Sequence, residues 1–403
     1  MPEIFLTIFF ISVLLFFLGS GIWVALSMIG VSAIGMMLFT SRPVGDAMAT
    51  TIWGTSSSWT LTALPLFVWM GEILFRTKLS ENLFKGLSPW LQKMPGGLIH
   101  VNVVGCALFA AISGSSAATV ATVGKMSIPE LRKRNYPEKI LLGSLAGSGT
   151  LGLLIPPSII LIIYGVAVQE SIAKLFIAGI IPGIMIALIF MSYVIVWSLI
   201  NKKEMPEILE EFSFLEKIKR SKQLLPVILL ISAVIGSIYT GIATATEAAS
   251  LGVVGALILS YFQKSLSIET FKSSLLGATK TSCMIAFILA GSTFLSLAMG
   301  FTGLPRNLAL WIQNMELSPY ILILVLMLFY IILGMFLDGI SAVVLTMAII
   351  EPMIRQAGFD MIWFGIFLVI VVEMAQITPP VGFNLFVLQG MANKDMGYIA
   401  KSA

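Results

Sequence analysis

The sequence predicts an all-α polytopic membrane protein made of two inverted repeats, each with a re-entrant hairpin and a helix broken at a Pro-Pro pair. Composition is the first reason, because 58% of the 403 residues are hydrophobic and only 11% are charged, against about 25% charged in soluble domains. The pairs Pro156-Pro157 and Pro379-Pro380 are the second, because each interrupts an apolar run long enough to cross a bilayer. The third is that most basic residues fall in a few short loops.

The first half of the chain begins with three apolar runs that predict spanning helices, at residues 4–18, 22–39 and 61–75. Residues 81–97 have one apolar helical face that includes Trp90, which indicates an amphipathic helix at the membrane interface. The next two runs, 98–112 and 117–128, fall short of the ~20 residues that a span needs, so we expect a re-entrant hairpin with its tip at 113–116. A broken span over 140–168 and an ordinary span over 175–200 follow.

The second half repeats this order after a hydrophilic linker at residues 201–223. It contains three more predicted spans, at residues 224–239, 245–262 and 275–299. A second hairpin is expected from the arms 320–337 and 341–350, and a second broken span from 361–388. Gly114 at the first tip precedes Pro156 by 42 residues, and Gly339 at the second tip precedes Pro379 by 40. This agreement in order and spacing predicts an internal repeat.

The basic residues predict the orientation of the chain. If the chain starts outside, the inner loops hold 19 of the 24 lysines and arginines, and only four lie outside: Arg42, Lys174, Arg306 and Arg355. This asymmetry agrees with the positive-inside rule, provided that both hairpins return to the side from which they enter. The two halves then have opposite orientations in nine crossings, with the N-terminus outside and the C-terminus inside.

Six segments resemble one family of membrane proteins: PLFVWMGEILFR (65–76), CALFAAISGSSAATVATVGK (106–125), GSLAGSGTLGLLIPPSIILIIYGV (143–166), TATEAASLGVVGAL (244–257), LDGISAVVLT (337–346) and ITPPVGFNLFVLQG (377–390). They look like the large membrane subunit of tripartite ATP-independent periplasmic (TRAP) transporters, over nearly the whole chain. The resemblance implies a multi-pass protein of the bacterial inner membrane that imports a small organic acid, is driven by sodium and moves as an elevator. It also implies two partners, a small four-helix membrane subunit and a periplasmic substrate-binding protein, with sodium ions as coupling ions and no other cofactor.

The two breaks are the expected ion sites. Non-helical backbone is tolerated at membrane depth only where protein buries it or it lines a polar cavity, and broken spans in corresponding places of two halves point to a transporter's binding site. Hydroxyl groups and free carbonyls coordinate sodium without a buried counter-charge. We therefore expect one sodium site from the hydroxyls of Ser113 and Ser116 with the backbone around the first break, at Gly152, Ile155 and Pro156.

A mirrored sodium site is expected at the second break. Its candidate ligands are the hydroxyl of Thr378 and the carbonyls of Gly334 or Gly339, Ala375 and Val381. Relatives often carry glycine just before this break, where the chain has Ala375 and Gln376, but a carbonyl ligand survives such a change. Because half-helix N-termini suit anions, the substrate is expected near four residues: Ser115, Ser158, Asp338 and Asn384. The simpler alternative is that small residues there only allow close helix packing.

These expectations divide the chain into a transport domain and a scaffold. Residues 98–168 and 319–403, with the hairpins and breaks, would form the transport domain. Residues 1–97 and 169–318, with the inner linker 201–223, would form the scaffold that contacts the small subunit. Of the charges in apolar runs, Glu373 could orient the second break, Glu72 and Glu247 fit structural pairs, and Lys280 either reaches the inner surface or pairs with an acid.

Three other classes of protein share some of these features. A stand-alone antiporter or symporter on a related fold would transport without a binding protein. A serine protease would need His100 within hydrogen-bond reach of Ser115 or Ser116, but they lie 15 or 16 residues apart along a helical arm, more than ~20 Å. A channel would arrange such hairpins in a ring. The sequence thus favours a transporter over an enzyme, and its one histidine and two cysteines indicate neither a metal centre nor a disulfide; nothing in it indicates a nucleic-acid partner.

Overall fold

The computed structural model describes residues 3–77, 79–206, 212–222, 224–303, 307 and 318–403, and in these ranges it contains helices and no strands. The helices up to the linker are α1 (Glu3–Gly19), α2 (Val24–Phe39), α3 (Val44–Ser56), η1 (Trp59–Thr62), α4 (Ala63–Phe75), α5 (Leu79–Leu91), α6 (Ile99–Ser113), α7 (Ser116–Lys133), α8 (Glu138–Leu154), α9 (Ile159–Ala167) and α10 (Ile172–Ile200). This all-α fold confirms the predicted class.

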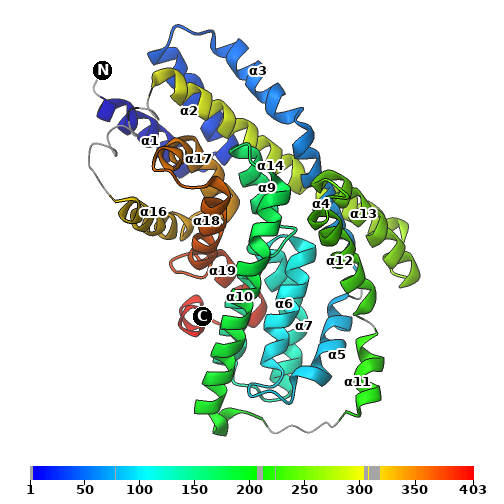
Figure 1. Ribbon diagram of the computed structural model, residues 1–403. Coiled ribbons are helices and arrows are strands. Elements are labelled where there is room, and N and C mark those ends of the chain that lie inside the picture. The colour runs from blue at the N-terminus through cyan, green and yellow to red at the C-terminus, as the bar shows by residue number, and fades with distance from the viewer. Residues whose placement is uncertain (1–2, 78, 207–211, 223, 304–306, 308–317) are drawn as a thin grey trace.

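The linker and second half supply the remaining helices. They are η2 (Lys202–Glu204), α11 (Phe214–Ser221), α12 (Leu225–Tyr239), α13 (Ala245–Phe262), α14 (Ile268–Thr302), α16 (Pro319–Gly334), α17 (Gly339–Gln356), α18 (Met361–Gln376), α19 (Phe383–Ala392) and α20 (Met396–Ser402). Figure 1 shows α10 running along the length of the molecule, with α3 near one end and α11 at the other. Arg306, one of the four basic residues expected outside, lies beyond the described residues.

Three α-helices had not been predicted: α3, α11, and α20 in the C-terminal segment that was expected to be an inner loop. α3 lies in a stretch whose polar residues, among them Asp46 and Thr50, hide its helical period. α11 lies in the linker and is short and charged. In the described residues, α10, α13, α14 and α17 are each long and apolar enough to cross a membrane, and up to seven spans result when bent pairs count as one. The nine crossings and the inverted orientation of the halves remain predictions.

Both predicted breaks are present. α8 and α9 meet at a bend of 41°, and the residues between α18 and α19 separate the second pair. Both Pro-Pro bonds are cis. A proline lacks the N–H that a helix needs and clashes with the preceding turn, so neither apolar run continues as one helix.

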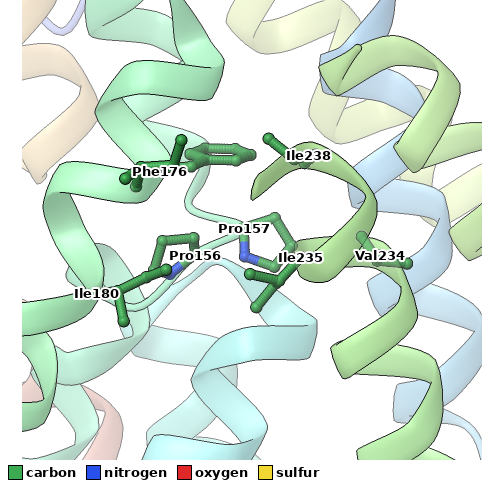
Figure 2. Close-up of a pocket in the computed structure, with 8 residues that line it drawn as sticks. Pro156, Pro157, Phe176, Ile180, Val234, Ile235 and Ile238 are labelled. Carbon is green, nitrogen blue, oxygen red and sulfur yellow. The ribbon is translucent and has the colours of Figure 1, made fainter. Parts of the chain in front are cut away.

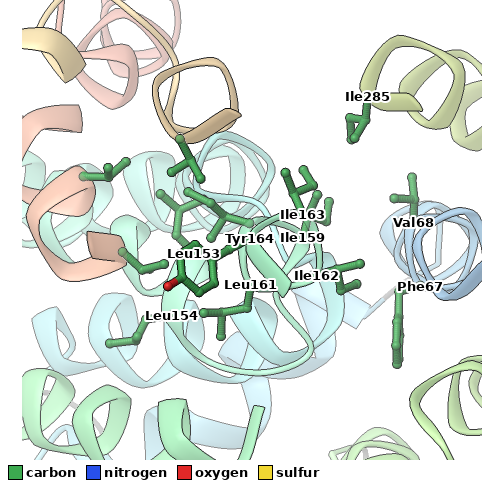
Figure 3. Close-up of a cluster of buried hydrophobic side chains, with 14 of the residues drawn as sticks. Phe67, Val68, Leu153, Leu154, Ile159, Leu161, Ile162, Ile163, Tyr164 and Ile285 are labelled. Carbon is green, nitrogen blue, oxygen red and sulfur yellow. The ribbon is translucent and has the colours of Figure 1, made fainter. Parts of the chain in front are cut away.

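α9 lies in the core of the molecule. Its residues from Ile159 to Tyr164 are all buried. Figure 3 shows Ile159, Ile162 and Ile163 on the side of Phe67 and Val68, and Leu161 and Tyr164 on the side of Leu153 and Leu154. The hydroxyl of Tyr164 donates to the carbonyl of Met361 at 2.6 Å, which ties α9 to the start of α18. A helix that is apolar on all sides is a buried helix, so the far arm of the first break is held by packing.

The two hairpins and two broken helices pack against one another. α6 and α7 lie on α8, α17 lies on α9 and α18, and α19 packs against α7. At one end, Arg132 of α7 pairs with Glu138 of α8 and donates to the carbonyl of Ala392 at 2.8 Å, while Lys394 lies 3.4 Å from Glu138. Segments far apart in the sequence are thereby joined, although their movement as one domain remains a proposal.

Candidate functional site

The tip of the first hairpin rests directly on the first break. Between α6 and α7, Gly114 has φ = 59°, a left-handed conformation that residues with a Cβ rarely adopt. A Cβ at Gly114 would also lie 2.8 Å from the carbonyl oxygen of Pro157. Across this contact, the N–H of Ile159 donates to the carbonyl of Gly114 at 3.2 Å. Glycine therefore allows the tip and the break to touch through their backbones.

Three oxygen atoms converge at this contact. The hydroxyls of Ser113 and Thr119 are 2.8 Å apart, and the Thr119 hydroxyl is 2.8 Å from the carbonyl oxygen of Ser115. A Cβ on Gly152 would lie 2.5 Å from that carbonyl oxygen and 2.7 Å from the Thr119 hydroxyl. The structure thus brings together the predicted residues Ser113, Ser115 and Gly152. Thr119 was missed, although its position one helical turn after Ser115 could have suggested it.

The first break is held by its own capping bonds. α8 ends at Leu154, and Ile155 is extended (φ −72°, ψ 120°). The Ser158 hydroxyl accepts from the N–H of Leu161 at 3.3 Å and donates to the carbonyl of Leu153, so this buried side chain links the two helix ends. Ser158 is one of the residues predicted near the substrate, and its hydroxyl has two partners inside the break.

On its other side the first break faces an apolar pocket. Figure 2 shows Pro156 and Pro157 between α10 and α12, where the pocket is completed by Phe176, Ile177, Ile180, Val234, Ile235 and Ile238. All of these side chains are hydrocarbon, so the pocket offers no ligand for a cation. The polar chemistry of the first break therefore lies on the side of the hairpin tip.

The second hairpin contacts α18 just before its break. Gly334, the last residue of α16, lies so close to Ala375 that a Cβ on it would be 2.6 Å from the Cβ of Ala375. A Cβ on Gly339, the first residue of α17, would lie 3.3 Å from the amide nitrogen of Gln376. Asp338 caps α17 by accepting from the N–H of Ser341 at 3.1 Å. Three predicted residues of the mirrored site, Gly334, Gly339 and Ala375, thus lie at one contact.

The turn after α18 holds the remaining predicted residues. The Thr378 hydroxyl donates to the carbonyl of Met374 at 2.6 Å, and its N–H donates to the carbonyl of Ala375 at 3.1 Å. Val381 is exposed, whereas Asn384 on α19 is fully buried, and both of its amide atoms lack a partner among the described residues. A buried amide without partners is costly, so Asn384 stays a candidate to hold a ligand.

A side-chain hydrogen bond joins the first half of the chain to the second, between the two candidate sites. The Ser116 hydroxyl donates to the amide oxygen of Gln376 at 3.3 Å, and both residues are buried. Ser116 therefore points toward the second broken helix, whereas Ser113 lies with Thr119. The caps also agree in register, since 41 residues separate the N-cap Ser115 from Pro156 and 41 separate the N-cap Asp338 from Pro379.

Comparisons with known proteins identify the family of the chain. Residues 9–403 match the family described as "Tripartite ATP-independent periplasmic transporter, DctM component". The chain belongs to this family. The C4-dicarboxylate TRAP transporter large permease protein DctM of Pseudomonas aeruginosa is 33% identical over 372 residues, which cover 92% of this chain and 86% of that protein.

Two further proteins extend the comparison. The isethionate TRAP transporter permease protein DctMQ of Oleidesulfovibrio alaskensis is 31% identical, over 96% of this chain and 60% of that protein. The crystal structure of the YdaH transporter of Alcanivorax borkumensis aligns with a TM-score of 0.66 at 11% identity, over 94% of this chain and 92% of that one. The latter shows a shared fold and no more.

The charged residues in the apolar runs of this TRAP permease have different surroundings. Glu72 forms an ion pair with Arg76 one turn later, and Glu247 accepts from the N–H of Thr244 at 2.8 Å in a capping box at the start of α13. Lys280 is exposed on α14 and forms no ion pair within the described residues. Glu373 is buried before the second break, and one of its carboxyl oxygens has no partner there.

Proposed function

We propose that this TRAP large permease subunit imports a small organic anion together with sodium, by moving a transport domain across the membrane against a scaffold. The observation that carries the proposal is the docking of each hairpin tip on a broken helix, with Ser116 and Gln376 joining the two halves. Broken helices expose free carbonyls and half-helix ends, which coordinate cations and attract anions. The transport domain consists of residues 98–168 and 319–403, and the other segments form the scaffold.

One proposed sodium site lies at each hairpin tip. The first uses the hydroxyl of Ser113 and the backbone around Gly152 and Ile155, with the hydroxyl of Thr119 and the carbonyl of Ser115 completing the oxygen cluster. The second uses the hydroxyl of Thr378 and the carbonyls of Gly334 or Gly339, Ala375 and Val381, where Gly334 packs against Ala375 and Gly339 against Gln376. Neutral oxygens suit a monovalent cation because they bring no charge into the interior.

The proposed substrate is a small organic acid, and the proposed partners are a small membrane subunit and a periplasmic binding protein. C4-dicarboxylate and isethionate, named for the two relatives, are both small anions. The relative named DctMQ extends well beyond the region that matches this chain, which agrees with a second membrane component joined to it. The N-terminus outside and the C-terminus inside complete the proposed arrangement in the inner membrane.

Sodium dependence of uptake tests the proposal. In proteoliposomes that contain both membrane subunits and the binding protein, Ser113→Ala and Thr378→Val should each raise the sodium concentration for half-maximal uptake about tenfold, because one oxygen ligand is lost. Thr293→Val is the matched control, since that hydroxyl donates to the carbonyl of Leu289 within its own helix α14, at 2.9 Å. Unchanged sodium dependence in both site variants would contradict the sites.

The same vesicles address the alternatives and the movement. A stand-alone antiporter or symporter would transport without the binding protein, whereas the proposal expects no uptake. To test the movement, a thiol reagent confined to the inside of the vesicles should label the cysteine of Ser115→Cys in the inward-facing state. The labelling should fall when a change in substrate and sodium favours the outward-facing state. Labelling from both sides at once would indicate a channel. A protease finds no support at this tip, because the Nε2 atom of His100 lies 2.7 Å from the carbonyl of Pro95, at the opposite end of α6 from Ser115.

A further inference from the structure

The linker helix α11 carries an apolar face that the described residues leave largely exposed. Phe214, Leu215 and Ile218 are 67%, 78% and 40% exposed. At 3.6 residues per turn these three positions fall within about 100° of the helix circumference. One side of a helix of only eight residues is therefore hydrocarbon that lies open at the surface of this chain.

α11 is docked on α5, the helix that the sequence predicts to lie at the membrane interface. The indole N–H of Trp90 donates to the hydroxyl of Ser221 at 2.7 Å, and the rings of Trp90 and Phe214 are 6.2 Å apart. Trp90 is itself 44% exposed. Figure 1 shows α5 and α11 side by side at the end of the molecule opposite α3. We call Trp90, Phe214, Leu215 and Ile218 with the adjoining basic residues the α5–α11 platform.

The platform is basic. Four cationic side chains lie on α11 or directly after it: Lys217, Lys219, Arg220 and Lys222. Lys217 and Lys219 fall on opposite sides of the apolar stripe, and the ammonium of Lys217 lies 5.5 Å from the centre of the Trp90 ring. The one acid of the helix, Glu216, is engaged in its N-terminal capping box with Ser213. Three acids of the linker, at 207, 210 and 211, precede α11 and lie outside the described residues.

We propose that the α5–α11 platform binds anionic lipid headgroups of the inner leaflet, with Phe214, Leu215 and Ile218 at the level where the acyl chains begin. Three apolar side chains are too few for a stable protein interface, but an apolar stripe flanked by lysines is the pattern of helices that lie in a bilayer surface. The sign of the charge selects the lipid, because anionic headgroups attract basic segments close to the membrane. α5 also packs on α6 and α7, so the bound lipid adjoins the first hairpin.

The depth of α11 tests the first half of the proposal. The full-length chain, with exposed Cys283 replaced by serine and buried Cys106 retained, would carry an environment-sensitive fluorophore at Leu215→Cys or at Arg220→Cys on the opposite face. The vesicles contain about one quarter phosphatidylglycerol. Lipid that carries a nitroxide near the headgroup should quench the fluorophore at position 215. The fluorophore at position 220 should instead be quenched by iodide in the aqueous phase. Equal quenching at both positions, or protection of position 215 only when another protein is present, would overturn it.

The lipid preference tests the second half. Replacing the phosphatidylglycerol by phosphatidylcholine should reduce quenching at position 215, and adding Lys217→Gln, Lys219→Gln and Lys222→Gln should remove that difference. Each lost charge is expected to shift the equilibrium between bound and free α11 about fivefold toward the free form. A control variant at the other end of the linker, Lys202→Gln and Lys203→Gln in η2, removes two positive charges away from the platform and should keep the lipid difference. Equal quenching in both lipids for the unmodified platform would refute the assignment.

Discussion

Gly114→Ala tests whether the first hairpin tip must touch the break. Alanine would have to keep φ = 59°, which costs a residue with a Cβ roughly 1–2 kcal/mol. Its Cβ would also lie 2.8 Å from the carbonyl oxygen of Pro157 and 3.1 Å from the N–H nitrogen of Ile159. Both neighbours are backbone atoms that cannot rotate away, so crowding adds about 1–3 kcal/mol. The expected loss of folding free energy is about 2–5 kcal/mol, a large part of the 5–15 kcal/mol typical of proteins.

Thermal unfolding of the purified chain, followed by tryptophan fluorescence, measures this loss. Gly390→Ala is the matched control, because Gly390 lies within α19 and a Cβ there would meet nothing within 4 Å. The control should be unchanged or more stable by up to about 1 kcal/mol. Both substitutions replace glycine by alanine, but only Gly114→Ala is expected to lower the melting temperature. Equal melting temperatures for the two variants would refute the close contact between tip and break.

Two further predictions concern the oxygen cluster and the end of α8. Thr119→Val keeps the side-chain shape but removes the hydroxyl between Ser113 and the Ser115 carbonyl. Sodium activation of uptake should therefore weaken, as it should for Ser113→Ala. Unaltered sodium activation would exclude Thr119 as a ligand. Glu138 is partly buried, which by itself raises its pKa, but the hydrogen bonds and charges of Arg132 and Lys394 outweigh this and hold the pKa of the Glu138 carboxyl below its usual value of 4.5. The stabilisation from this carboxylate is therefore present above about pH 4.5 and is lost as the pH falls through the lower pKa of the folded state. Glu138→Gln should thus lower the melting temperature near pH 7. The difference in melting temperature between this variant and the unsubstituted chain should shrink at acidic pH. A difference in melting temperature that does not change with pH would contradict the pairing.

The features that the sequence predicts correctly are those with a local physical cause. Proline breaks a helix through its own ring and missing N–H, so both breaks could be placed from Pro156 and Pro379 alone. Glycine and serine between two apolar runs likewise indicate a tip, and Gly114 lies there in the left-handed conformation. By contrast, α3 was missed because polar residues such as Asp46 and Thr50 interrupt its apolar pattern, and α11 because it is short and charged.

The partners within the candidate site have no local signal. Ser116 and Gln376 are 260 residues apart in the chain, and only the packing of α7 against the second half brings them together. The spacing of Ser113 and Ser116 suggested a common ligand, whereas in the structure their hydroxyls have different partners. Of the two, Ser113 is the one placed in the oxygen cluster, and the uptake of Ser113→Ala tests it as a sodium ligand.

The two hairpin tips differ in their electrostatic character. Ser115 begins α7 without a side-chain bond to its N–H groups, whereas the carboxylate of Asp338 caps the equivalent end of α17. An open helix N-terminus is equivalent to roughly half a positive charge, and at α17 the carboxylate offsets that charge. The two helix ends therefore differ in charge: the N-terminus of α7 keeps its partial positive charge, whereas at α17 the carboxylate of Asp338 offsets it. The likeness of the two hairpins in helix order therefore does not extend to the charges at their helix ends.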